Sequence, residues 1–197
     1  MLCALESAGI SCSVPLLWGF GLSSEHGRFE ILVTREIKGA VNLKEAFRAG
    51  TASVVPDDLP MLFDLVRQMH QRGIYHGALL PKNILVVPVP QWRPTFSLID
   101  LIKAIHFHND IQHTVMARYD LLSLMHGMKN LCPGINYEPL LLRYGLGQTD
   151  IRELLDQLML YRSTRHLRNQ LAFRFKVWAL IVRCRKRLSL RNRDKEV

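Results

Sequence analysis

The segment from His76 to Asn83 is short and polar, and together with the two apolar runs after it, it constrains the fold more than any other feature of the chain. Residues 84–87 form an apolar run typical of a buried strand, and a Pro-rich turn then leads to a second run, Phe96 to Leu101. This second run carries Asp100 next to its end. The order predicts a polar loop and a hairpin that ends on an acid, which brings several chemically useful side chains to one place.

An amphipathic helix precedes this loop, over about residues 57–72. Asp57 and Asp58 are placed to cap it, Pro60 suits its first turn, and Gly73 ends it. One face is apolar, because the following residues recur at helical spacing: Met61, Leu62, Leu65, Val66 and Met69.

The remaining elements predict an α+β fold with strands near the front and helices behind. Met1 to Ser7 is typical of a helix end, residues 10–20 of an extended segment, and residues 29–34 alternate in polarity as a strand does. Helical patterns occur at about 115–129, 138–146, 149–161 and 164–188. A chain that begins at the end of a helix leads us to expect that part of a domain precedes it. The grouping of elements does not suit alternating βαβ units.

Positive charge is concentrated in one part of the chain. The protein has 197 residues, 48% of them apolar, and a formal net charge of +9. Residues 161–197 hold 12 Lys and Arg against 2 acids, so the rest of the chain is nearly neutral. No apolar run approaches the roughly 18 residues of a membrane span, and the N-terminus lacks the pattern of a signal peptide. We therefore expect a cytoplasmic protein.

The cysteines and a group of histidines have simple interpretations. Cys3, Cys12, Cys132 and Cys184 have no zinc-like spacing and are expected to be reduced thiols. A dense group of possible ligands occurs between residues 106 and 113, namely His106, His108, Asp110 and His113. Its spacing matches no metal motif, which favours solvated loop side chains over a transition-metal site.

The order of helix, His-Gly-x-x-x-x-x-Asn, strand, turn, strand and Asp resembles the catalytic half of a protein-kinase-like fold. The pair His76-Gly77, the approach Gly73-Ile74-Tyr75 and the sequence Leu98-Ile99-Asp100-Leu101 are most similar to the lipopolysaccharide kinases of the Kdo/WaaP family. The resemblance covers roughly residues 1–160. It implies ATP and Mg²⁺ as cofactors and a Kdo or heptose hydroxyl of the lipopolysaccharide core as acceptor.

The resemblance also implies roles for particular residues. Asn83 and Asp100 take the positions of the metal ligands, and both offer the hard oxygen atoms that Mg²⁺ prefers. The backbone of Glu36, Ile37 and Lys38 is implied to contact the adenine edge, and Leu85 is implied to supply the apolar floor of the pocket. In the catalytic loop, the family's acid is replaced by Ala78, and His76 is expected to hold that loop in place or, as an alternative, to act as a substitute base.

Two departures from the family pattern weaken the expected activity. Ala78 has no group that can accept a proton or orient a hydroxyl, and a positioned base typically supplies on the order of 10²- to 10⁴-fold in rate. The Gly-rich phosphate loop and the phosphate-pairing Lys also have no counterpart in the sequence. The chain is therefore expected to be a truncated or degenerate kinase, or else a pseudokinase that binds partners.

These observations predict three parts: a remnant of the N-terminal lobe and hinge over 1–40, a kinase-like C-terminal lobe over 41–160, and a basic amphipathic helix and tail over 161–197. The predicted function is a lipopolysaccharide core sugar kinase with little or no activity, and the alternative is a non-catalytic interaction module at a membrane surface.

The basic segment suits more than one role. Apolar residues line one face of its predicted helix, namely Leu167, Leu171, Phe175, Trp178 and Val182. Such a helix either binds the anionic surface of the inner membrane or packs its apolar face on the lobe with a solvated basic side. Nucleic acid is a weaker alternative, because no nucleic-acid-binding fold motif accompanies the charge. The sequence does not indicate an oligomeric state.

Overall fold

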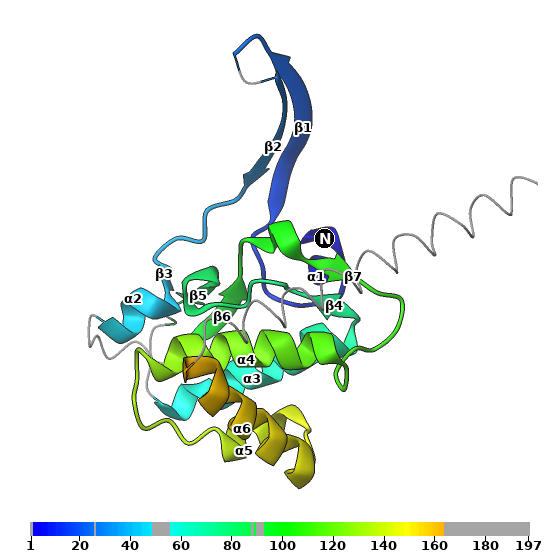
Figure 1. Ribbon diagram of the computed structural model, residues 1–197. Helices are drawn as coiled ribbons and strands as arrows, with labels where there is room; N and C mark the ends of the chain where they lie inside the picture. Colours follow the sequence, from blue (N-terminus) through cyan, green and yellow to red (C-terminus); the bar gives the residue numbers. More distant parts are fainter. Residues whose placement is uncertain (1, 26, 49–55, 88, 90–92, 164–197) are drawn as a thin grey trace, which may run out of the picture. The chain divides into compact units, whose positions relative to one another are not determined.

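The computed structural model describes residues 2–25, 27–48, 56–87, 89 and 93–163 (Figure 1). The chain divides into two compact units, residues 1–154 and 155–197, and the elements below belong to the first except where α6 passes its end. The helix predicted over 164–188 and the basic tail lie outside the described residues. None of the helices in the described part has the length and apolar character needed to cross a bilayer.

The front of the chain forms a helix and a long hairpin. Helix α1 spans Leu2–Ser7, and strands β1 (Pro15–Ser23) and β2 (Gly27–Thr34) pair antiparallel, with Trp18 opposite Leu32. The prediction of one strand at 29–34 was therefore incomplete, because the segment before it pairs with it along nearly its whole length. The glycines at 19 and 21 obscured its alternation in the sequence.

A three-stranded antiparallel sheet, in the order β3-β5-β6, carries the predicted hairpin. Strands β5 (Ile84–Val87) and β6 (Thr95–Leu98) pair with Ile84 opposite Leu98, and β3 (Val41–Asn42) lies on the other side of β5. The second predicted strand thus ends at Leu98, before Asp100. Beside this sheet, β4 (Ile74–Tyr75) pairs with β7 (Ile105–His106), and the short 3-10 helix η2 covers Pro81–Asn83. The predicted loop therefore contains a short strand and a helical turn.

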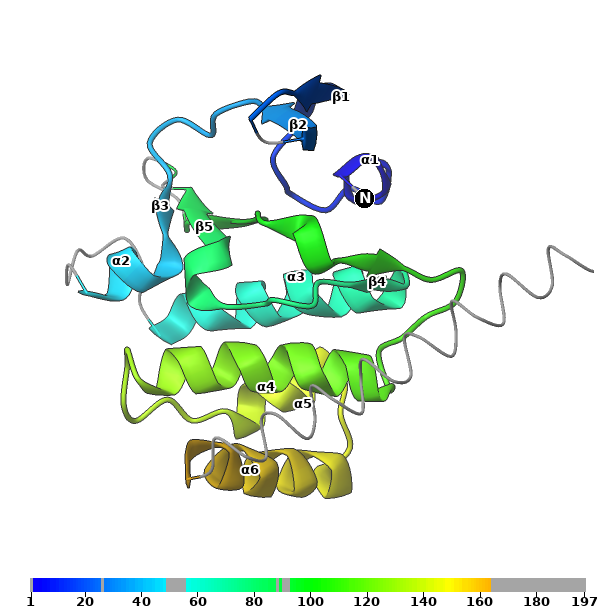
Figure 2. The same cartoon turned by 45° about the horizontal axis from the view of Figure 1, so that its top comes forward.

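The helices form the greater part of the core. They are α2 (Leu43–Arg48), α3 (Leu59–Gln71), α4 (Val115–Lys129), α5 (Glu138–Tyr144) and α6 (Gln148–Ser163), with 3-10 turns η1 at Pro56–Asp58 and η3 at Leu101–Lys103. Figure 2 shows α3 running between the strands and α4. Both faces of α3 that meet these layers are apolar, and its fully buried residues include Leu62, Phe63, Val66 and Met69. The α+β class is confirmed.

The predicted helix boundaries need small corrections. Asp58 stands at the N-cap of α3 but makes no capping hydrogen bond with its side chain, because its backbone is already in the helical region. Helix α5 ends at Tyr144 rather than 146, since Gly145 adopts φ of 103° and closes it. Helix α6 begins one residue earlier and ends two residues later than predicted.

Candidate functional site

The loop that begins at His76 is held from below by one buried carboxylate. The backbone N–H of His76 donates to Oδ2 of Asp120 at 2.8 Å, and the N–H of Gly77 donates to Oδ1 at 3.0 Å. Asp120 lies on α4 and is fully buried. Two charge-assisted hydrogen bonds to adjacent amides fix the start of the loop in position and direction. The sequence analysis did not identify Asp120, since a single acid in an apolar helix 44 residues away carries no local signal.

The same carboxylate joins a wider buried network. Nε2 of His70, on α3, lies 3.3 Å from Oδ2 of Asp120, and its Nδ1 lies 2.7 Å from the hydroxyl of Tyr144 on α5. That hydroxyl donates to the carbonyl oxygen of Gln112 at 3.1 Å. Burial, and then the charge of Asp120, raises the pKa of Tyr144 well above its ordinary value, so the phenol stays protonated. Three helices are thereby tied to the loop.

Gly77 is the residue that this conformation requires. Its φ is +75°, and a Cβ atom added there would lie 2.7 Å from the carbonyl oxygen of Lys103. A side chain at this position would therefore be strained and would collide with backbone. The pair His-Gly seen in the sequence thus has a structural reason, which is the close approach of η3 to the loop.

The side chain of His76 is enclosed. Its Nε2 lies 3.1 Å from the carbonyl oxygen of Ile99, so Nε2 carries the proton and donates. Nδ1 is buried and has no hydrogen-bond partner among the described residues. Burial lowers the pKa of His76, and this outweighs the opposing effect of Asp120. The geometry agrees with a structural role that joins the loop to the segment before Asp100, and it offers no open path from this ring to an acceptor.

We expect the enclosed imidazole to make folding sensitive to acid. An unfolded His titrates near pH 6.5, while the folded pKa of His76 is lower. The unfolded chain therefore binds a proton that the folded chain excludes, and stability is lost as the pH falls below about 6.5, by at most about 1.4 kcal/mol per pH unit for this one group. Urea unfolding between pH 7.5 and 5 measures this loss.

The variant His76→Gln should flatten the dependence, because it removes the titrating group and keeps an N–H near Ile99. A matched control is His113→Gln, since His113 is exposed. If His113→Gln reduces the slope as much as His76→Gln does, the dependence does not come from His76.

Asn83 and Asp100 lie at the same end of the β5-β6 pair. The backbone N–H of Ile99, the residue before Asp100, donates to the carbonyl oxygen of Asn83 at 3.0 Å. Nδ2 of Asn83 donates to the carbonyl oxygen of Ala78 at 2.9 Å, which closes the loop on itself. The two predicted metal ligands are thus brought to neighbouring positions, although they are 17 residues apart in sequence.

Asp100 has an unusual backbone. Its φ is 59° and its ψ 54°, and it is the only non-glycine with positive φ among the described residues. Aspartate tolerates the left-handed region better than most residues, yet the conformation still costs free energy. Such local strain persists where the surroundings impose it, and it is concentrated at functional sites. The carboxylate is exposed, which distinguishes it from the buried Asp120.

A cavity of about 890 Å³ opens beside Asp100. Glu36, Ile37 and Leu85, which were predicted to contact a nucleotide, all line it, whereas Lys38 is exposed and does not. His76, Ala78 and Asn83 are not lining residues either. The hairpin and the segments on either side of it supply wall residues that the sequence analysis missed, including Pro15, Trp18, Leu32, Thr34 and Arg35. Their contribution depends on how the hairpin stands over β5, which no local pattern indicates.

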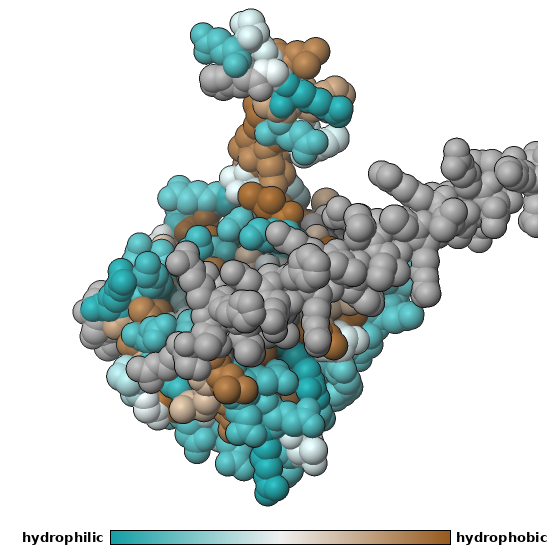
Figure 3. All heavy atoms as spheres, in the orientation of Figure 1, coloured by the Kyte–Doolittle hydropathy of each residue, from teal (hydrophilic) through white to brown (hydrophobic). Residues whose placement is uncertain are grey.

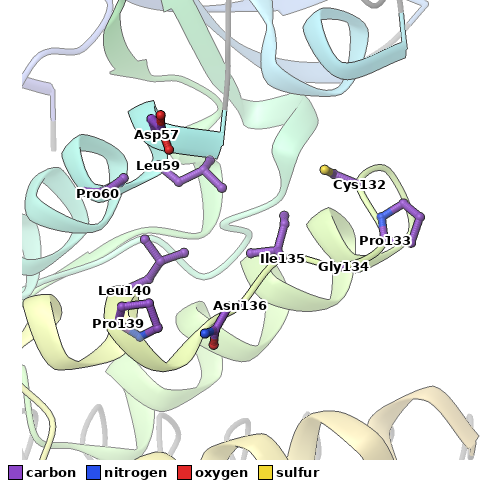
Figure 4. A pocket seen from close by; sticks show the side chains of 10 residues that line it. All are labelled: Asp57, Leu59, Pro60, Cys132, Pro133, Gly134, Ile135, Asn136, Pro139 and Leu140. Carbon is purple, nitrogen blue, oxygen red and sulfur yellow. The ribbon is translucent and has the colours of Figure 1, made fainter.

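A second cavity, of about 570 Å³, lies away from these residues (Figure 4). It is formed by the start of α3, the loop after α4 and the start of α5. Figure 4 shows apolar side chains, Leu59, Ile135 and Leu140, between Asp57 and Cys132. None of its residues was a candidate from the sequence.

The histidine-rich loop does not form a metal centre in the part of the chain that the structure describes. No group of three or more His, Cys, Asp or Glu side chains gathers there in a way that could hold an ion. His106, His108, Asp110 and His113 are all exposed, as expected of loop side chains.

Comparisons with known proteins agree on one family. The sequence model of the lipopolysaccharide kinase (Kdo/WaaP) family matches residues 1–127. Among solved structures, the chain is similar to one described as WaaP in complex with acyl carrier protein, with a TM-score of 0.61 and 19% identity, over 81% of this chain and 71% of that one. No curated protein matches. The structural likeness supports the protein-kinase-like fold.

Proposed function

Since the chain belongs to the lipopolysaccharide kinase (Kdo/WaaP) family, we propose that it is a lipopolysaccharide core sugar kinase-like protein that binds ATP with Mg²⁺ beside Asp100 and turns it over slowly or not at all. The observation that carries the proposal is the meeting of the predicted nucleotide contacts and Asp100 around one cavity. The acceptor would be a Kdo or heptose hydroxyl of the core oligosaccharide.

The chemistry of the cavity walls suits a nucleotide. Apolar side chains, including Leu32, Ile37 and Leu85, offer surfaces for a flat base. The backbone that links β2 to β3 passes along the wall at Glu36 and Ile37, where amide and carbonyl groups could pair with the adenine edge. The anionic end of the nucleotide would then lie toward Asp100, where a cation is needed between the two negative groups.

Asn83 and Asp100 fit a magnesium ion by donor type. A carboxylate and an amide carbonyl are hard oxygen ligands, and Mg²⁺ is commonly held by one or two such groups together with phosphate oxygens and water. When bound, the ion neutralises the charge that develops on the transferred phosphoryl group. The loop supports this arrangement through Asp120, because the amides that Asp120 holds precede Asn83 by only a few residues.

Slow turnover is the consequence of Ala78. Its carbonyl oxygen accepts hydrogen bonds from Asn83 Nδ2 and from the N–H of Leu80, so the backbone of the loop keeps an ordered shape. The methyl side chain, however, neither accepts a proton nor orients an acceptor hydroxyl. His76 is a poor replacement, since its ring is enclosed and its Nε2 proton is already donated to Ile99.

Substituting Asp100→Asn should weaken binding of Mg²⁺-ATP by about tenfold or more, because one negative ligand of the cation is removed. Titration calorimetry or fluorescence with a nucleotide analogue measures the dissociation constant, with and without Mg²⁺. The matched control is Asp57→Asn, which alters an exposed carboxylate at the other cavity. Equal affinities for wild type and Asp100→Asn in the presence of Mg²⁺ would count against the proposed site.

A second candidate function, a non-catalytic interaction module at an anionic membrane surface, is favoured by Ala78 together with the charge of the C-terminal segment. Residues 161–197 hold 12 basic and 2 acidic residues, and a basic residue near an anionic bilayer contributes about 1 kcal/mol. Deleting residues 164–197 should then abolish co-sedimentation with anionic vesicles, whereas neutral vesicles should bind neither form. Unchanged sedimentation after the deletion would remove this candidate.

A further inference from the structure

The β1-β2 hairpin leaves an unusual amount of apolar surface uncovered. Nine large apolar side chains are 37–85% exposed, namely Leu16, Leu17, Trp18, Phe20, Leu22, Phe29, Ile31, Leu32 and Val33. Figure 3 shows them as a continuous brown surface along the hairpin. A two-stranded ribbon is marginal in water by itself, and a contiguous apolar patch of this kind is typical of an interaction surface.

Both long edges of this hairpin are open. Among the described residues, β1 pairs with β2 and with no other strand, and the same holds for β2. An open edge presents unpaired N–H and C=O groups that can form a ladder with a further strand. An added strand would therefore gain hydrogen bonds and apolar contacts at the same time.

The edge of β2 carries charges that are self-complementary. In a symmetric antiparallel pair, the two copies are related by a two-fold axis perpendicular to the sheet, and opposite residues share one face. If the axis passes through Phe29, Arg28 of each copy lies opposite Glu30 of the other. Two ion pairs then form across the junction, and Phe29 meets its own counterpart on the other face.

Neighbouring registers are less favourable. An axis through Glu30 would place the two Glu30 carboxylates opposite each other, and like charges directly opposite are destabilising. An axis through Ile31 would place Glu30 opposite Leu32, so the charge would have no partner. The edge of β1 offers no charged residue to set a register, because its sequence is Pro-Leu-Leu-Trp-Gly-Phe-Gly-Leu-Ser.

We propose that a second copy of this chain pairs with the β2 edge, antiparallel and centred on Phe29, to form a four-stranded sheet shared by a homodimer. Arg28 already lies 5.7 Å from the ring centroid of Phe20, which holds the guanidinium on the face where the partner's Glu30 would arrive. The base of the same hairpin supplies Trp18, Leu32 and Thr34 to the larger cavity, so pairing also steadies one wall of that cavity. The pairing does not depend on the proposed nucleotide binding.

Charge exchange tests the pairing on the full-length chain. Sedimentation equilibrium of the wild type should show a monomer–dimer equilibrium. Arg28→Glu and Glu30→Arg should each raise the dissociation constant of the dimer by about tenfold or more, because two attractive pairs become two repulsive ones. The double variant Arg28→Glu/Glu30→Arg should restore dimerisation, since the pairs return with their signs exchanged. A wild type that stays monomeric, or a double variant that remains as weak as the single ones, would overturn the proposal.

Cross-linking tests the register independently. With the four native cysteines replaced by serine, Phe29→Cys should form a symmetric intermolecular disulfide on oxidation with oxidised glutathione, because the two Cα atoms would lie opposite each other within bonding range. Ile31→Cys should not, since its counterpart would be displaced along the strand. A preferential cross-link at 31 would contradict the register, and circular dichroism shows whether each variant is folded.

Discussion

Replacing Asp120 with alanine is expected to lower the free energy of unfolding by about 3–5 kcal/mol, which is a large part of the stability of a domain of this size. The reason is that two backbone N–H groups, of His76 and Gly77, and Nε2 of His70 would lose their common acceptor. All of these groups lie in the interior, where water cannot easily replace the carboxylate. Urea denaturation followed by circular dichroism measures the change.

Two further variants show whether burial is the cause. Asp120→Asn keeps one acceptor oxygen and should cost less than alanine. Asp64→Asn is the matched control, because Asp64 also has two cationic partners, Arg67 and Arg143, but lies near the surface. Its cost should be about 1 kcal/mol or less. If Asp120→Ala and Asp64→Asn were equally stable, the buried network could not be what holds the loop.

Replacing Ala78 with aspartate is expected to increase ATP-dependent phosphoryl transfer by on the order of 10²- to 10⁴-fold over the present chain, if the proposed nucleotide binding is correct. Ala78 is only partly buried, so the larger side chain has room. Its backbone carbonyl keeps its bonds with Asn83 and Leu80, because the substitution does not alter the main chain. A sensitive assay of ATP consumption with a core oligosaccharide acceptor measures the rate.

The control for this gain is Ala78→Asn, which has nearly the same size as aspartate but cannot accept a proton at neutral pH. It should remain as slow as the parent chain. A rate that rises equally in both variants would assign the effect to shape rather than to the carboxylate. Nucleotide affinity, measured beside the rate, separates a failure of binding from a failure of the catalytic step.

The elements around the site were largely predictable because their signals are local. The helix before Gly73, the apolar run at 84–87 and the acid after the second strand each depend on residues close together in sequence. The resemblance to lipopolysaccharide kinases rests on the same short segments, and the match over residues 1–127 confirms it. Neighbouring strands of a hairpin bring their ends together, so the approach of Asn83 to the segment before Asp100 also results from local order.

The support of the site was not predictable in this way. Asp120 approaches His76 only because α4 packs against the loop, and the packing needs Gly127, where a Cβ atom would lie 2.4 Å from Cδ of Pro81. Lys38, although it directly succeeds two residues that line the larger cavity, is not itself part of the lining. Such outcomes depend on the three-dimensional placement of distant elements rather than on spacing.

The amino-acid sequence by itself determined the order of the elements, the α+β class, the identity of the groups that could do chemistry and the loss of the acid at Ala78. Tertiary structure alone decided that Asp120 anchors the loop, that His76 is enclosed and that the hairpin supplies a wall of the larger cavity and keeps an open edge. The physical reason is that helix and strand patterns arise from contacts a few residues apart, whereas burial, charge pairing across elements and cavity shape arise from contacts between residues that the chain keeps far apart.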